Sequence, residues 1–344
     1  MGPQRASSAS GRNISSGGSS TVLAIVLALV SALGYGASDF AAGVASRAAS
    51  VLQVTVLSEG LSMVLLLIVV PWVSSQSPSA AALWWGAFAG FAEVVGTFAL
   101  YLGFRHAAFS VASSLSAVGS AAFAVIAGLA LGERPGTLAL VGIAIALPAI
   151  VAVSASSDEP DEAGEPQASE PQPSKPEPGG PEESAPEPGA PAAAGGQPRG
   201  ATGRHALGVV LGILAGAGFA GMFIGLNQAG NSHDLWPAVT AQAAALATAL
   251  IAAAAGRQLL HRPTAHTTLL AGLTGAAGTV GLIFYFLATH LGLLAITAVI
   301  TSLYPASTIV LARAMLSERL TRFRIAGLCL AAASVALIAI SGAG

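Results

Sequence analysis

Charged residues are scarce in this chain of 344 residues. Asp, Glu, Lys and Arg make up only 9% of the sequence, whereas hydrophobic residues make up 54%. A water-soluble protein of this length needs a more strongly charged surface, so the composition indicates a protein embedded in a lipid bilayer. No cluster of basic residues suggests binding to nucleic acid.

Cysteine is nearly absent as well. The single cysteine, Cys329, lies in an apolar run, so the sequence offers neither a disulfide framework nor a cysteine-based metal site. The phosphate-binding pattern G-x-x-x-x-G-K-[ST] is missing, as are the G-x-S-x-G and H-E-x-x-H patterns of hydrolases and zinc proteases. We therefore predict no cofactor, no metal and no enzymatic activity.

Long apolar segments are what the chain has in abundance. A helix of about twenty residues crosses the hydrocarbon core of a bilayer, and short connections make successive helices antiparallel neighbours. The predicted fold class is an all-α membrane protein with about ten transmembrane helices. We place these helices at residues 22–42, 51–74, 80–103, 107–131, 136–155, 205–227, 236–256, 267–289, 293–316 and 322–341.

Two segments interrupt this pattern. Residues 1–20 are rich in Ser and Gly, which is typical of a disordered tail. Residues 156–203 contain eleven of the nineteen prolines and ten of the sixteen acidic residues. Because this composition cannot bury a core, we predict a disordered acidic linker between a first five-helix half, residues 21–155, and a second, residues 204–344.

The two halves are related in sequence. Near the start of each half, Leu33-Gly34-Tyr35-Gly36 matches Ala217-Gly218-Phe219-Ala220 at an offset of 184. Each half has an odd number of predicted crossings, so the second half enters the membrane from the opposite side. The result is an inverted repeat, an arrangement that many secondary transporters share. At an offset of 185 the matching residues are Gly96 with Gly281, Leu102 with Leu287, Glu133-Arg134 with Glu318-Arg319, and Gly142 with Gly327.

These features resemble the EamA-type family of the drug/metabolite transporter superfamily, whose members have ten helices in two five-helix repeats. The most specific matches are Leu131-Gly132-Glu133-Arg134 and Leu316-Ser317-Glu318-Arg319, each followed by a glycine in the next helix. Leu303-Tyr304-Pro305 is similar to a proline-containing stretch in the ninth helix of the family. The resemblance implies a central cavity lined by helices one to four and six to nine, with helices five and ten at the periphery.

Acidic side chains inside apolar helices are candidates for the substrate or coupling site, because a charge in lipid is costly unless it faces water or a partner. Glu93 lies in the middle of the third predicted helix, and we favour a cavity-facing role over a buried structural one. Glu59, in the second helix, stays open between these two roles. For Asp39, near the end of the first helix, a structural role beside the headgroups is favoured.

The second half offers other groups at matching positions. Gln242 lies near the counterpart of Glu59, and Gly278 is the counterpart of Glu93, so we expect a chemically asymmetric cavity. Tyr304 and Pro305 lie near the middle of the ninth predicted helix, where proline bends a helix. They provide either a cavity hydroxyl and a hinge or a packed kink. The candidate cavity residues are Glu93, Glu59, Asp39, Gln242, Tyr304 and Pro305.

We predict a secondary transporter that moves a small organic solute across the plasma membrane by alternating access. A metabolite, an amino acid and an amphiphilic or cationic drug are the solutes considered. In one hypothesis Glu93, helped by Glu59, takes up a proton and a cationic substrate in turn, because burial favours the neutral form of a carboxyl. The alternative is a non-transporting membrane sensor or assembly protein.

The expected partners are a small-molecule substrate and the lipid bilayer, without nucleic acid, and a homodimer stays an option. Glu133-Arg134 and Glu318-Arg319 are interpreted as structural residues at helix ends that fix the turn into the next helix. The orientation in the membrane stays open. The resemblance implies cytoplasmic termini, whereas the count of arginines favours the opposite orientation.

Overall fold

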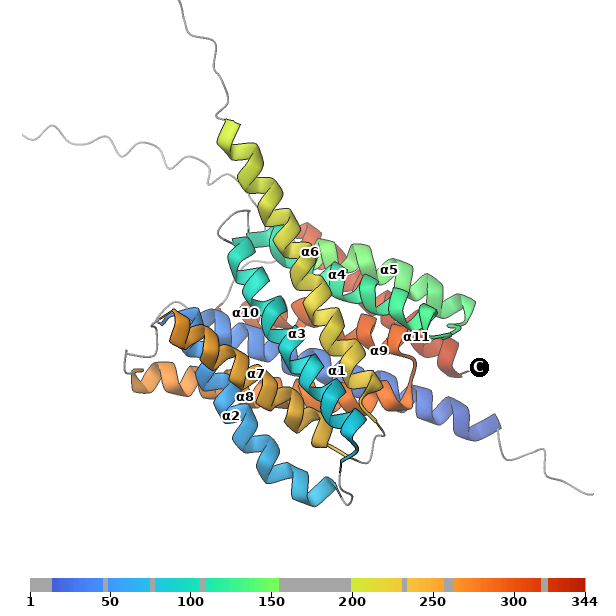
Figure 1. Cartoon of the computed structure of the whole chain (residues 1–344). Helices are drawn as coiled ribbons and strands as arrows, with labels where there is room; N and C mark the ends of the chain where they lie inside the picture. Colours follow the sequence, from blue (N-terminus) through green and yellow to red (C-terminus); the bar gives the residue numbers. More distant parts are fainter. Residues whose placement is uncertain are drawn as a thin grey trace, which may run out of the picture.

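The protein folds as a bundle of helices, shown by a computed structural model (Figure 1). The structure describes residues 14–45, 49–74, 78–104, 109–154, 199–230, 234–256, 263–316 and 321–343, and these residues form no strand. The predicted all-α membrane fold is confirmed. The helices are α1 (Ile14–Ala45), α2 (Val51–Val73), α3 (Ala80–Phe104), α4 (Phe109–Ala130), α5 (Thr137–Ser154), α6 (Arg199–Gln228), α7 (Trp236–Ala255), α8 (Ala265–Leu291), α9 (Leu294–Thr301), α10 (Tyr304–Leu316) and α11 (Arg322–Ala343).

The membrane-spanning helices agree with the predicted ones. Within the described residues, nine segments are long and apolar enough to cross a bilayer, with α9 and α10 counted together as one. The one predicted helix not among these nine is the fourth, residues 107–131, which corresponds to α4 and has a shorter apolar stretch at Leu115–Ala130. Apolar length was therefore a sufficient signal for locating the helices.

Two helices extend beyond their predicted ends. α1 begins at Ile14 and α6 begins at Arg199, so the helices include the last residues of the predicted tail and of the predicted linker. The remaining parts of those two segments, residues 1–13 and 156–198, lie outside the described residues.

The two halves pack against each other around a pseudo-two-fold axis. α1 packs on α8 and α3 packs on α6, and each of these pairs becomes the other when the halves are exchanged. α2 packs on α7, α4 on α9 and α5 on α11, so helices on the axis meet their own counterparts. This pattern follows from the sequence repeat and brings the first three helices of each half to the centre.

Pairs of glycines mark the two central crossings. A Cβ atom added to Gly34 in α1 would stand 2.6 Å from the backbone nitrogen of Gly281 in α8. At the counterpart crossing, a Cβ atom on Gly218 in α6 would stand 2.5 Å from the Cα atom of Gly96 in α3. Residues without side chains allow helix backbones to approach this closely. The glycines matched in the sequence repeat therefore form one packing contact that is used twice.

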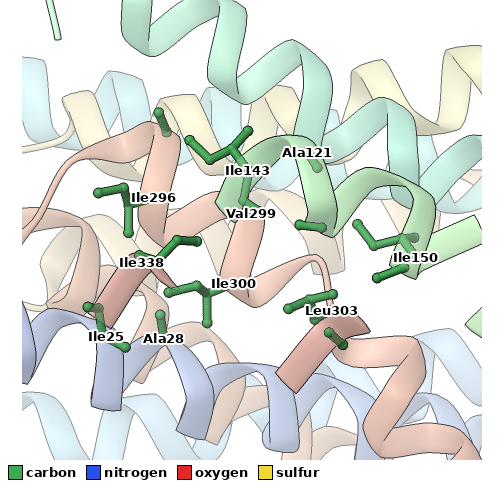
Figure 2. Packing of buried hydrophobic residues seen from close by; sticks show 14 of the residues in the cluster. Ile25, Ala28, Ala121, Ile143, Ile150, Ile296, Val299, Ile300, Leu303 and Ile338 are labelled. Carbon is green, nitrogen blue, oxygen red and sulfur yellow. The ribbon is translucent and has the colours of Figure 1, made fainter. Parts of the chain in front are cut away.

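The helices that follow the two Glu motifs also meet through glycine. Gly142 in α5 lies against α11, where its carbonyl accepts a hydrogen bond from Ser334 Oγ at 2.8 Å. Gly327 in α11 lies against Val153 of α5 in the same way. Figure 2 shows the apolar core beside this contact, where Ile143 and Ile338 pack among residues of α1, α4 and α9. α5 and α11 thus form one edge of the bundle, as expected for peripheral helices (Figure 1).

The turn after α4 connects the two halves through Glu133. Gly132 has a φ of +92°, the left-handed conformation that glycine adopts most easily, and it ends the helix. This turn directs the Glu133 carboxylate to the start of α9, where it accepts hydrogen bonds from the backbone nitrogens of Leu294 at 2.5 Å and Ala295 at 2.9 Å. Our interpretation of Glu133 as structural was therefore incomplete, since it caps a helix of the other half. Its counterpart Glu318 lies outside the described residues.

The ninth predicted helix is broken instead of bent. α9 ends at Thr301 and α10 begins at Tyr304, with Ser302 and Leu303 between them. Pro305, the second residue of α10, has no N–H group to donate to the carbonyl of Thr301. A proline is well tolerated in the first turn of a helix, where its missing N–H group would be unpaired in any case. The residue predicted to bend one helix thus helps to start a second one.

The glycine crossings can be tested by adding a methyl group. We expect Gly34→Ala and Gly218→Ala each to destabilise the protein by about 1–3 kcal/mol, because the added carbon overlaps backbone atoms of the facing helix. Thermal unfolding of the purified protein in detergent measures the loss. Gly60→Ala is the matched control, since a Cβ atom there meets no atom within 4 Å. Equal melting temperatures for all three variants would contradict the close crossing.

The Glu133 cap can be tested by removing its carboxylate. Glu133→Ala leaves two amides at the start of α9 without their acceptor, so we expect a loss of about 1 kcal/mol in the free energy of unfolding. Arg134→Ala removes a neighbouring exposed charge and serves as the control. A thermal unfolding curve that shifts as much for Arg134→Ala as for Glu133→Ala would argue against the cap.

Candidate functional site

A cavity of about 160 Å³ lies between the two halves of the bundle. Its described lining residues come from α1, α2, α3, α6, α7, α8 and α10, with none from α5 or α11. The expected contribution of the fourth helix is not found among these lining residues. Pockets for drug-sized ligands are usually larger, about 300–1,000 Å³, so this conformation has room for a small solute.

Three acidic side chains line the cavity, and all three come from the first half. They are Asp39 on α1, Glu59 on α2 and Glu93 on α3. Glu59 and Glu93 are half-buried, whereas Asp39 is exposed. The described lining includes no Lys, Arg or His, so no fixed cation balances the carboxylates there. The cavity is therefore acidic and favours a ligand with positive charge.

The structure brings together five of the six candidate residues. Gln242 and Tyr304 line the cavity with the three acids. Pro305 is half-buried next to Tyr304 but is not one of the lining residues. The proline thus affects the site through the helix break, which places Tyr304 at the start of α10.

Gln242 connects the two halves by holding Glu59. Its side-chain nitrogen Nε2 donates to the Glu59 carboxylate and, at 3.3 Å, to the backbone carbonyl oxygen of Glu59. A backbone carbonyl can only accept a hydrogen bond, so the NH₂ group and not the amide oxygen faces Glu59. Gln242 is 5% exposed, which keeps water from replacing it as a donor. The sequence repeat placed Gln242 near the counterpart of Glu59. In the structure the two side chains are in direct contact across the pseudo-two-fold axis.

Glu93 has a different environment. No described residue donates a hydrogen bond to its carboxyl group, although its backbone carbonyl accepts one from Thr97 Oγ1 at 3.0 Å. Gly278, the counterpart of Glu93 in the repeat, also lines the cavity and has no side chain to offer. Glu93 and Glu59 are close enough to interact electrostatically. The two cavity glutamates therefore differ in their hydrogen bonds: the Glu59 carboxylate accepts one from Gln242, whereas the Glu93 carboxyl group accepts none from a described residue.

Aromatic side chains form part of the cavity wall, and the sequence reasoning missed most of them. Tyr35 on α1, Phe219 and Phe223 on α6, and Tyr304 on α10 line the cavity. Tyr35 and Phe219 occupy matching positions in the repeat, each directly after the glycine of a crossing. Their position in the repeat could have identified Tyr35 and Phe219 from the sequence, because a residue next to a central crossing has to lie near the centre of the bundle.

The cavity extends toward one end of the bundle. Its lining includes Ala42, near the end of α1, and Val54, near the start of α2. The opposite end is closed by a polar cluster in which Asn227 donates to Thr289 Oγ1 at 2.9 Å and Tyr285 donates to the carbonyl of Phe223 at 3.1 Å. The described cavity lining includes neither partner of the Asn227 bond, so it stops short of the end where α8 meets α9.

The charge and exposure of the cavity can be tested with thiol reagents. In a Cys329→Ser background, we expect Thr97→Cys to react with a cationic methanethiosulfonate about tenfold faster than with its anionic analogue, because the surrounding carboxylates attract the cation. Ala298→Cys is the control, since this position is fully buried outside the cavity lining. Labelling rates followed by mass spectrometry measure both effects. Similar rates with the two reagents would argue against an acidic cavity.

Comparison with known proteins agrees with this architecture. A family model described as the EamA-like transporter family matches residues 22–155 and 206–340. A solved structure, described only as a crystal structure of a protein, is similar over 93% of this chain and 97% of its own, with a TM-score of 0.64 and 13% sequence identity. At this identity the similarity concerns the fold alone. No curated protein matches the sequence.

Proposed function

Because the chain belongs to the EamA-like transporter family, in the drug/metabolite transporter superfamily, we propose that it is a secondary carrier for a small organic cation in the plasma membrane. Members of this family are multi-pass membrane transporters and not enzymes. The observation that carries the substrate class is the cavity between the halves, where three carboxylates meet without a basic residue in the described lining.

The residues of the cavity wall favour an organic cation that has an apolar body. Carboxylates attract positive charge, and aromatic rings such as those of Tyr35, Phe219 and Tyr304 in the lining form additional favourable contacts with an ammonium group. The same rings pack against an apolar body. A small amine or quaternary ammonium compound satisfies both parts of the wall, whereas a small anion would meet uncompensated repulsion from the carboxylates.

The packing of the two halves supports alternating access. An inverted repeat can exchange the conformations of its halves, which turns a cavity open at one end into a cavity open at the other. The contacts of α1 with α8 and of α3 with α6 are equivalent glycine crossings, as an exchange of conformations between the halves requires. The polar cluster at the closed end would have to separate during that exchange.

The driving force that fits this cavity is a proton gradient. Glu59 and Glu93 are titratable groups that the substrate would meet directly. A carboxyl group that binds a proton in one step of the cycle and a substrate cation in another step moves the proton and the cation in opposite directions across the membrane. The carrier would then work as an antiporter of protons and organic cations.

Transport can be tested with the purified full-length protein in liposomes. With a proton gradient imposed, we expect substrate-dependent proton flux for amines and quaternary ammonium ions, and none for anions. A panel of amino acids, amines and cationic dyes, read by a pH-sensitive dye inside the vesicles, measures this. In Glu93→Gln we expect the proton signal to fall to the level of empty liposomes, because the variant cannot carry the proton.

Controls give the other outcomes a clear meaning. Thr248→Val removes a hydroxyl that bonds within its own helix, outside the cavity lining, and should transport like the wild type. Cation flux without proton movement would contradict the proton coupling but keep the carrier. No flux of any compound would contradict transport and favour a sensor or assembly protein.

A further inference from the structure

We propose that the two cavity glutamates have separate tasks: Glu59 is the permanent anion that binds the substrate cation, and Glu93 carries the exchanged proton. In this proposal Gln242 is the positioning residue that makes the difference. The inference rests on the proposed function and deepens it, because it states which group binds which cargo and predicts a fixed exchange ratio.

The first step concerns Glu59. The Gln242 Nε2 atom donates to two oxygens of Glu59, one in its carboxylate and one in its backbone carbonyl. A donor held in this way stabilises the ionised carboxylate more than the neutral acid. Because Gln242 is buried and anchored at two points, the donor cannot turn away. Of the two glutamates, Glu59 is therefore the one whose anion is stabilised by a hydrogen-bond donor from the other half.

The second step concerns Glu93. No described residue donates a hydrogen bond to its carboxyl group. Its counterpart in the repeat is Gly278, which has no side chain that could donate one. The neighbouring Glu59 charge opposes a second negative charge. Without a cation in the cavity, the proton therefore stays on Glu93. With a cation present, the repulsion between the carboxylates is offset and the proton can leave.

The remaining titratable groups do not change this assignment. Asp39 lines the same cavity from α1, and its side chain is more exposed than those of Glu59 and Glu93. Tyr35 and Tyr304 line the cavity as neutral phenols. The described side chains that α6 and α7 contribute to the lining include no acid or base. Glu59 and Glu93 thus form the pair whose charges decide what the cavity holds.

The exchange balances in charge. In the empty cavity Glu59 is ionised and Glu93 is protonated, which gives the pair one negative charge. When a monovalent cation binds to Glu59, the O–H bond of Glu93 breaks and the proton passes to water at the open end. Two carboxylates and one cation again give one net negative charge. Each cation bound therefore releases one proton, and the cavity keeps the same charge with either cargo.

Isothermal titration calorimetry on the full-length protein in detergent tests this assignment. Tetramethylammonium chloride is the probe, because it has no proton to lose and any released proton must come from the protein. Titrations in two buffers that differ in protonation enthalpy give the number of protons released per bound cation. For the wild type we expect about one proton per cation near neutral pH.

The variants separate the two tasks. We expect Glu93→Gln to bind the cation with a dissociation constant within about threefold of the wild type and to release no proton. We expect Glu59→Gln to weaken binding by more than about tenfold. In Gln242→Leu, Glu59 loses its donor and also takes up a proton, so binding weakens and the proton count rises above one as the pH is lowered. A purely packing role for Gln242 would leave the proton count unchanged.

Controls guard against misfolding. Thr248→Val is the matched polar-to-apolar change on α7 and should keep both the affinity and the proton count. Gln242→Asn keeps the amide but shortens its reach, and it should resemble Gln242→Leu while disturbing the packing less. If Gln242→Leu does not elute as a single folded species in gel filtration, Gln242→Asn and the two glutamate variants decide the result.

The outcomes distinguish this inference from the proposed function. If the wild type binds and transports the cation but Glu93→Gln loses binding while Glu59→Gln loses only the proton release, the tasks are reversed and the inference fails alone. It also fails if Gln242→Leu and Gln242→Asn both keep a proton count of one. If the wild type neither binds nor transports any organic cation, both the proposed function and the inference are wrong.

Discussion

The close approach of Gly34 to Gly281, and of Gly218 to Gly96, brings the backbones of the two halves into contact where α1 crosses α8 and α6 crosses α3. Everything that lines the cavity is placed relative to these two crossings. Tyr35 and Phe219 follow the glycines of α1 and α6, and Glu93 precedes Gly96 by less than one turn of α3. A larger residue at a crossing would separate the helices and widen the space between these side chains.

The fold is nearly symmetric, whereas the chemistry of its cavity is not. The first half contributes the three acids, and the second half contributes an amide at Gln242 and a hydrogen atom at Gly278. Two identical halves would place four glutamates around one axis, and their mutual repulsion in an apolar setting would be costly. The second half has no glutamate at the matching positions, so only the repulsion between Glu59 and Glu93 remains, and each of these two acids has a different neighbour.

Much of this could be predicted from the sequence, because apolar length and a fixed repeat offset are local or linear signals. The cost of a charge in lipid likewise identified Glu93, Glu59 and Asp39, which the structure places in one cavity. The bond between Gln242 and Glu59 could not be predicted, since it depends on α2 and α7 meeting on the axis. The Glu133 contact joins residues 161 positions apart and was equally inaccessible.

The Glu133 contact also has a consequence for how the chain is made. Glu133 leaves the ribosome long before Leu294, so the acceptor for the first amides of α9 is already in the membrane when that helix arrives. α9 has only eight residues before the break, and in lipid its unpaired amides would oppose insertion. The first half therefore acts as a template for the second, and a second half synthesised alone would lack a surface on which to complete its ninth segment.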